Sequence, residues 1–147
     1  MKSISDLSPN NIFDCFVLAL RILDLQKEIG AKGGSSAFDI LDCPLGTSGG
    51  EWDAQKIEKT VYDAMRIGGL TGRLNTCLSR SVIRCRLMRE AGIDARVIFG
   101  LNKNEDMLKG HCWVVWEGSS GPGLKDSNFD FIEVYPSIEK HPGWFPE

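Results

Sequence analysis

The sequence has neither a long apolar run nor an excess of positive charge. Its longest apolar stretch, Phe16–Leu20, is bounded by Asp14 and Arg21, whereas a membrane-spanning helix needs about 20 apolar residues. Acidic residues number 20 against 17 basic ones, a formal net charge of −3. We therefore expect no membrane span, and no surface that binds the phosphates of nucleic acid.

Cysteine pairs of the CxxC type are also missing. The number of cysteines is odd and their spacing is wide, which argues against a disulfide framework; they are Cys15, Cys43, Cys77, Cys85 and Cys112. The first ten residues contain one lysine and no apolar run of signal-peptide type. We therefore expect a cytoplasmic protein with free thiols and without a metal or other cofactor.

Length and composition are those of one globular domain. The chain has 147 residues, of which 42% are hydrophobic and 25% charged, and a single core suffices at this size. We expect one domain over residues 1–147.

Predicted helices precede predicted strands, the order typical of an α+β fold. The first helix covers 10–29, with Ser8 or Asn10 as cap and Gly30 as end; its apolar stripe is Phe13, Phe16, Val17, Leu20, Leu23, Leu25 and Ile29. Two more helices cover 52–67 and 77–92, and strands cover 95–99, 111–116 and 129–135. The glycine-rich segment 30–51 is predicted to be a loop, either a flap or a plain surface connection, and 102–110 a polar loop.

Cys77 is the candidate nucleophile. It opens the third predicted helix, where Thr76 or Asn75 can serve as cap, and a thiol in the first turn meets the positive end of the helix dipole. A nucleophilic thiolate needs a base. Only two histidines are present: His111 begins a predicted strand, whereas His141 lies in a proline-rich tail. We therefore pair Cys77 with His111.

A carboxylate is needed to orient the imidazole, and its identity depends on the turn that follows the His111 strand. A turn at 118–119 places Asp126 opposite His111. A turn around 121–123 instead places Glu133 opposite His111, and Asp130 then points to the other face unless a bulge intervenes. Asp126 and Glu133 are both kept as candidates.

Three segments of the chain resemble the transglutaminase-like cysteine peptidases, in particular the stand-alone leader peptidases (B2 proteins) of lasso-peptide biosynthesis. They are 76–81 (TCLSRS), 87–100 (LMREAGIDARVIFG) and 110–114 (GHCWV). The resemblance extends from Gln55 to Gly118 and includes the approximate distance from cysteine to histidine. The sequence departs from the family at Ser79, where the family has proline, and at Cys112, where it has alanine.

The resemblance implies a papain/transglutaminase-like fold in which N-terminal helices pack on a small antiparallel sheet. It implies a cysteine protease that removes the leader peptide from a ribosomally synthesised precursor, with a small leader-recognition protein and a cyclase as partners. In such a mechanism we expect the Cys77 amide and the Asn75 side chain to stabilise the oxyanion.

Other functions stay open at this point. The same triad could transfer an acyl group to an amine, as a transglutaminase-like acyltransferase or amidase does. The chain could also be a binding module that keeps the fold without catalysis. A zinc site would require Cys77, Cys85, His111 and Cys112 to converge, which the absence of a CxxC pair disfavours.

Overall fold

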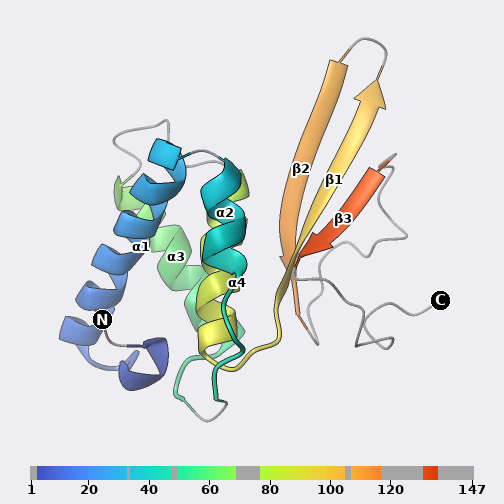
Figure 1. Ribbon diagram of the computed structural model, residues 1–147. Helices are drawn as coiled ribbons and strands as arrows, with labels where there is room; N and C mark the ends of the chain where they lie inside the picture. Colours follow the sequence, from blue (N-terminus) through green and yellow to red (C-terminus); the bar gives the residue numbers. More distant parts are fainter. Residues whose placement is uncertain are drawn as a thin grey trace.

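The computed structural model describes residues 3–32, 34–47, 50–68, 77–104, 107–116 and 131–135. Within these ranges, helices come first and strands follow (Figure 1). The helices are the 3-10 helix η1 (Ile4–Asp6) and the α-helices α1 (Ile12–Lys32), α2 (Gly34–Leu41), α3 (Ala54–Gly68) and α4 (Cys77–Glu90). The strands are β1 (Arg96–Asn104), β2 (Met107–Val115) and β3 (Phe131–Tyr135). The predicted α+β class is confirmed.

The strands form an antiparallel sheet with the order β2-β1-β3, and the helices lie on one side of it (Figure 1). Helix α4 contacts both β1 and β2. Its other sides contact α1, α2 and α3. Helix α4 is therefore the element that joins the helical layer to the sheet.

Burial of α4 extends around most of its surface. Its buried positions include polar ones, and the full set is Ser79, Ser81, Val82, Ile83, Cys85, Leu87, Met88 and Arg89. A buried polar group is costly unless it finds a partner. The Ser81 hydroxyl accordingly donates to the Cys112 carbonyl at 3.2 Å, and Arg89 Nη1 donates to Asp94 Oδ1 at 3.0 Å.

Helix α4 ends as the sequence predicts, at a glycine. Gly92 has a φ of 81°, a left-handed conformation in which a side chain is disfavoured. The Gly92 amide donates to the Arg89 carbonyl, and the Ile93 amide donates to the Met88 carbonyl. This pair of bonds is the Schellman motif, which satisfies carbonyls that the helix itself leaves without a donor.

The prediction of a loop over 30–51 is wrong for its first half. Helix α1 continues through Gly30, and α2 occupies 34–41. Ala37, Ile40 and Leu41 are buried, while the Phe38 ring lies 5.8 Å from the Phe99 ring and 5.2 Å from the Tyr135 ring. Tertiary packing of this apolar face overrides the low helix propensity of the surrounding glycines.

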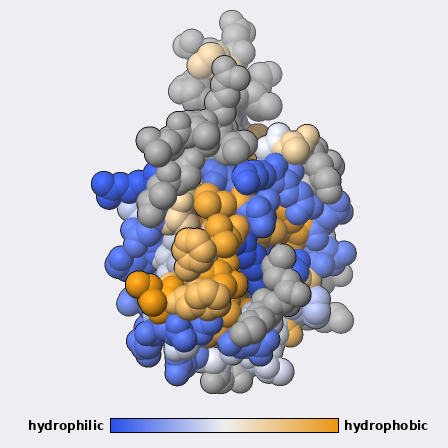
Figure 2. Space-filling view, turned by 90° about the vertical axis from the view of Figure 1, so that its left-hand side faces the viewer, coloured by the Kyte–Doolittle hydropathy of each residue, from blue (hydrophilic) through white to orange (hydrophobic). Residues whose placement is uncertain are grey.

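Helix α1 has apolar residues on more than one side, so its predicted core face is partly wrong. Its cap is Asn11, which accepts from the Phe13 amide at 2.9 Å. The positions that enter the core are Leu18, Ile22, Gln26 and Ile29, whereas Ile12, Phe13, Phe16 and Leu20 are exposed. Figure 2 shows a hydrophobic area on the side of the molecule where α1 lies in Figure 1.

Strands β1 and β2 are longer than predicted. Their ladder runs from Arg96↔Val115 to Asn104↔Met107, so most of the polar segment predicted as a loop over 102–110 is strand. Backbone pairing does not require apolar side chains, and the hydrophobic pattern of the sequence therefore missed this end of the hairpin.

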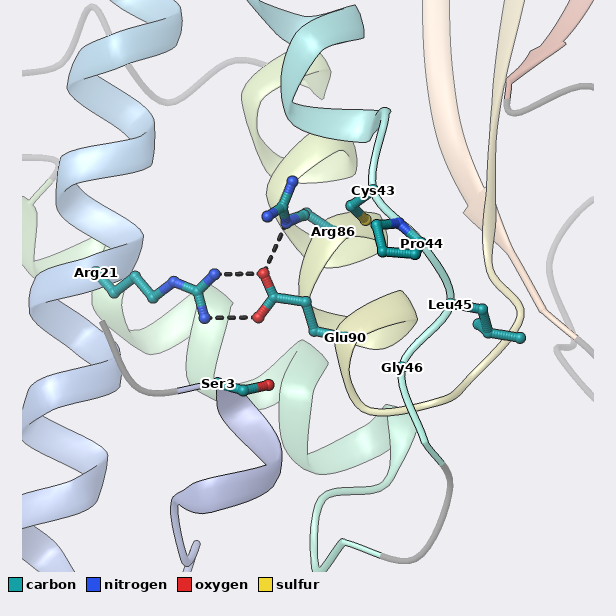
Figure 3. A pocket seen from close by; sticks show the side chains of 8 residues that line it. All are labelled: Ser3, Arg21, Cys43, Pro44, Leu45, Gly46, Arg86 and Glu90. Carbon is teal, nitrogen blue, oxygen red and sulfur yellow. Dashed lines mark hydrogen bonds and ion pairs between the residues drawn. The ribbon is translucent and has the colours of Figure 1, made fainter.

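A partly buried carboxylate joins the C-terminal end of α4 to α1 (Figure 3). Glu90 accepts a bidentate ion pair from Arg21 and a 2.7 Å bond from Arg86 Nε. Arg86 Nη1 also donates to the Ile40 carbonyl at 2.8 Å. Burial alone would raise the pKa of Glu90, but the hydrogen bonds and charges of the two arginines hold it below the ordinary value of 4.5.

The segment that follows α2 lies directly against the end of α4. The Gly46 amide donates to the Arg89 carbonyl at 2.7 Å. A Cβ at Gly46 would collide with the Glu90 backbone, its carbonyl carbon lying 2.7 Å away. At Gly50, by contrast, the nearest atom would be Ser5 Cα at an ordinary 3.7 Å.

The Glu90→Gln substitution should lower the free energy of unfolding at pH 7 by about 2 kcal/mol, because it leaves two arginines without their anion. A lowered pKa stabilises the fold fully above the ordinary value and progressively less as the pH falls through the lowered one. The difference between wild type and variant should therefore shrink below about pH 4.5. Urea unfolding over a pH series measures this difference in the free energy of unfolding. Asp63→Asn, which breaks the exposed pair with Lys59, is the control and should cost less than about 1 kcal/mol.

The Gly46→Ala substitution should destabilise the protein by about 1–3 kcal/mol, because the added methyl group overpacks rigid backbone. Gly50→Ala is the matched control, for which we expect a change within about 0.5 kcal/mol. Thermal unfolding of the two variants side by side compares them. Equal melting temperatures would show that 42–47 does not pack on α4 as described.

Candidate functional site

Cys77 is the first residue of α4. Its side chain is partly exposed and packs against the edge of the hydrophobic core. The amides of the first helical turn have no intrahelical acceptors, and together with the helix dipole they favour negative charge at this end. The structure therefore places the thiol at a helix N-terminus, as the sequence predicts.

The Cys77 thiol lies against the thiol of Cys112 in β2. Burial raises the pKa of Cys112 to about 12, and the charge of Cys77 and a hydrogen bond with its thiol add to this rise. The Ser81 hydroxyl and the Arg80 guanidinium act in the opposite direction. One turn along α4 from Cys77, the bond from Ser81 to the Cys112 carbonyl holds the helix against the strand.

His111 precedes Cys112 in β2, and its imidazole is exposed. Its ring stacks on Trp113, with centroids 5.8 Å apart and planes inclined by 25°. Successive side chains of a strand point to opposite faces, and Cys112 belongs to the core that α4 covers. The structure thus brings Cys77 to the strand that carries His111 but places the imidazole on the other face of that strand.

Glu133 does not lie opposite His111, so this prediction is wrong. The backbone of Glu133 pairs with Phe99, whose partner in β2 is Cys112. His111 pairs with Gly100 of β1, and Gly100 pairs in turn with Ile132 of β3. The reason is the strand order: β1 lies between β2 and β3, whereas the prediction treated the last two strands as a hairpin.

The remaining predicted positions lie outside the part of the chain that the structure describes. These are Asn75, Asp126, Asp130 and His141. The predicted roles of Asn75 at the oxyanion and of Asp126 as orienting carboxylate therefore stay predictions.

Cys112 is the residue of this site that the sequence analysis did not assign. It was noted only as a departure from the family and as one of four residues that a zinc site would require. A signal was nevertheless present. Cys77 and Ser81 are one turn apart on the same face of a helix, and Cys112 lies on the same face of its strand as the apolar Val114. Together these spacings indicate which face of the strand the helix covers.

Within the described residues, no group of three or more His, Cys, Asp or Glu side chains is placed to hold a metal ion. Over the same ranges, none of the helices combines the length and the apolar character that crossing a membrane requires.

A cavity of about 450 Å³ lies at the other end of α4 (Figure 3). It is lined by residues of four segments, namely Ser3, Arg21, Cys43, Pro44, Leu45, Gly46, Arg86 and Glu90. From Cys77 to Glu90 the helix rises by about 20 Å. This cavity is therefore separate from the surroundings of Cys77, and its polar groups are mainly the arginines paired with Glu90.

A family model described as the transglutaminase-like superfamily matches residues 44–133. The match covers more than half of the chain and includes Cys77, Cys112 and His111. The chain therefore belongs to the transglutaminase-like superfamily. No curated protein and no solved structure matches it.

The site predicts an order of thiol reactivity. Cys77 should react with iodoacetamide well before Cys85 and Cys112, because burial raises the pKa of each of the latter to about 12 and the thiolate is the reacting form. Peptide mapping by mass spectrometry after brief labelling at pH 7.5 measures the three rates. Labelling of Cys112 as fast as that of Cys77 would contradict the burial of Cys112 under α4.

Proposed function

We propose that the protein is a cysteine peptidase that removes the leader peptide from a ribosomally synthesised, lasso-type precursor. The observation that carries the proposal is a partly exposed cysteine on the first residue of a buried helix, within the region that matches the transglutaminase-like superfamily. A fixed, partly exposed thiol at a helix N-terminus suits a nucleophile, because the amides of the first turn can donate to the oxyanion that its attack creates.

In the proposed mechanism, Cys77 Sγ attacks the carbonyl carbon of the scissile peptide bond. His111 accepts the thiol proton and later donates it to the leaving amine. The amide of Cys77 and the side chain of Asn75 donate to the oxyanion. A carboxylate orients the imidazole, and Asp126 is the candidate that remains for this role. Water then hydrolyses the thioester, which frees the product carboxylate and the thiol.

This mechanism requires the imidazole of His111 to turn toward α4. In the described sheet, β2 pairs with β1 alone, so one side of its backbone makes no ladder bond with the described strands. A one-residue bulge in such an edge strand re-aims the following side chain to the opposite face. We propose that β2 adopts a bulge of this kind when the substrate is bound.

The finer assignment to precursor maturation is supported by the resemblance of 76–81, 87–100 and 110–114 to the leader peptidases of lasso-peptide biosynthesis. On this proposal, the protein acts in the cytoplasm together with a small leader-recognition protein and a cyclase.

A second candidate function is a binding module that keeps the superfamily fold without catalysis. The position of the His111 imidazole on the face of β2 away from α4 is the observation that favours it. The two candidates differ in whether any bond in the precursor is broken. A third candidate, acyl transfer to an amine, differs from the peptidase in its product.

Catalysis is tested by incubating the protein with a lasso-type precursor peptide and following the products by mass spectrometry. Wild type should release a leader with a free carboxylate. Cys77→Ala should abolish turnover, and His111→Ala should reduce it by about 10²–10⁴-fold through loss of the general base. Cys15→Ala, which removes a thiol on α1, is the control and should leave the rate unchanged.

Each result separates one pair of candidates. A new amide in place of a free carboxylate would establish acyl transfer instead. Binding of the precursor by wild type without cleavage, with its leader-recognition partner present, would establish the binding module. Full activity of Cys77→Ala would refute the assignment of the nucleophile.

A further inference from the structure

Two cysteines from distant parts of the sequence meet where α4 contacts β2. Cys77 and Cys112 are both free thiols. Cys112 belongs to the buried core and Cys77 packs against that core; the charge of Cys77 also acts on Cys112, so the two side chains are neighbours. The bond from Ser81 to the Cys112 carbonyl fixes the helix on the strand. The relative position of the two sulfur atoms is therefore set by packing in the core.

The members of this pair differ in their access to solvent. Cys77 is partly exposed, whereas Cys112 is only 6% exposed. A small oxidant therefore reaches Cys77 first. The sulfur atom of Cys112 is the buried neighbour of Cys77. This is the arrangement of a reactive cysteine with a resolving partner.

We propose that Cys77 and Cys112 are a modification site, a dithiol that hydrogen peroxide converts reversibly to a disulfide. The two sulfur atoms must come to within about 2.05 Å of each other for the bond to form. Cys77 lies at the end of α4, so the side-chain rotation that is needed does not have to pass through the packed middle of the helix.

The reaction proceeds in two balanced steps. The Cys77 thiolate attacks one oxygen of the peroxide, the O–O bond breaks, and protonation of the departing hydroxide gives sulfenic acid and water. Cys112 Sγ then attacks the Cys77 sulfur, the S–O bond breaks, and the proton of Cys112 leaves with the hydroxide as a second water. The two thiols lose two electrons in total, and the peroxide gains them.

A second pair of neighbouring thiols serves as an internal comparison. The charge of Cys43 raises the pKa of Cys85, so these two also lie near each other. Cys85 is completely buried and Cys43 nearly so. Because neither thiol of this pair is open to an oxidant, we expect it to stay reduced while Cys77 and Cys112 react.

The consequence of the disulfide rests on the proposed function. If Cys77 is the nucleophile, the disulfide blocks catalysis until a thiol reductant restores it. Formation of the disulfide itself does not depend on catalysis, so it is measured on the protein alone.

The experiment treats the reduced full-length protein with a small excess of hydrogen peroxide at pH 7.5. The intact mass should fall by two hydrogen atoms, and a non-reducing peptide map should show 77 linked to 112. Dithiothreitol should reverse both changes. In Cys112→Ala no such mass loss should occur, and Cys77 should gain oxygen instead. Cys43→Ser is the matched control and should still form the link.

Circular dichroism establishes that each variant is folded, and Cys112→Ser replaces Cys112→Ala if the latter is not. The proposal is overturned if Cys77 and Cys112 gain oxygen independently in wild type, if the disulfide joins two molecules, or if it forms only between Cys43 and Cys85. Failure of the proposed function would give a different result. The disulfide between Cys77 and Cys112 would form in full, although the reduced protein cleaves no precursor.

Discussion

The whole arrangement depends on the burial of α4. This helix contacts the other three α-helices and two strands, and the side chains along most of its surface are buried. A helix covered in this way cannot rotate or slide without opening the core, since close packing tolerates little displacement. The ends of α4 are therefore fixed points of the molecule, and Cys77 and Glu90 occupy them.

The two ends of α4 use different chemistry. At the N-terminal end, a thiol lies beside the amides of the first helical turn and against a second thiol in β2. At the C-terminal end, Glu90 holds arginines from two helices, and Gly46 lies too close to the backbone for any side chain. The second end anchors the helix, and this anchoring keeps the first end in place against the sheet.

Local signals in the sequence were sufficient for most of the elements. Ile57, Val61, Ala64 and Met65 recur at helical spacing and are all buried in α3, and Gly92 ends α4. The signals failed where packing outweighed propensity. Helix α2 forms among glycines because Ala37 and Leu41 enter the core, and α1 carries apolar residues on two sides, so its pattern could not tell which side is inside.

The candidate site was predictable only in part. Its cysteine follows from the start of a helix, which is a local property. The neighbours of that cysteine follow from strand order and from the face that the helix covers, which depend on the whole chain. Placing Glu133 opposite His111 assumed that the last two strands are adjacent, and the insertion of β1 between them shifts the match to Phe99.

The central position of β1 also bears on how the molecule assembles. Its pairing with β2 is local, because the ladder closes at Asn104 and Met107, and hairpins of this kind form within microseconds. Its pairing with β3 joins Leu101 to Phe131, thirty positions along the chain, and such distant pairings carry a larger entropy cost and slow folding. Strand β3 would thus join the sheet last, when most of the chain has already been synthesised.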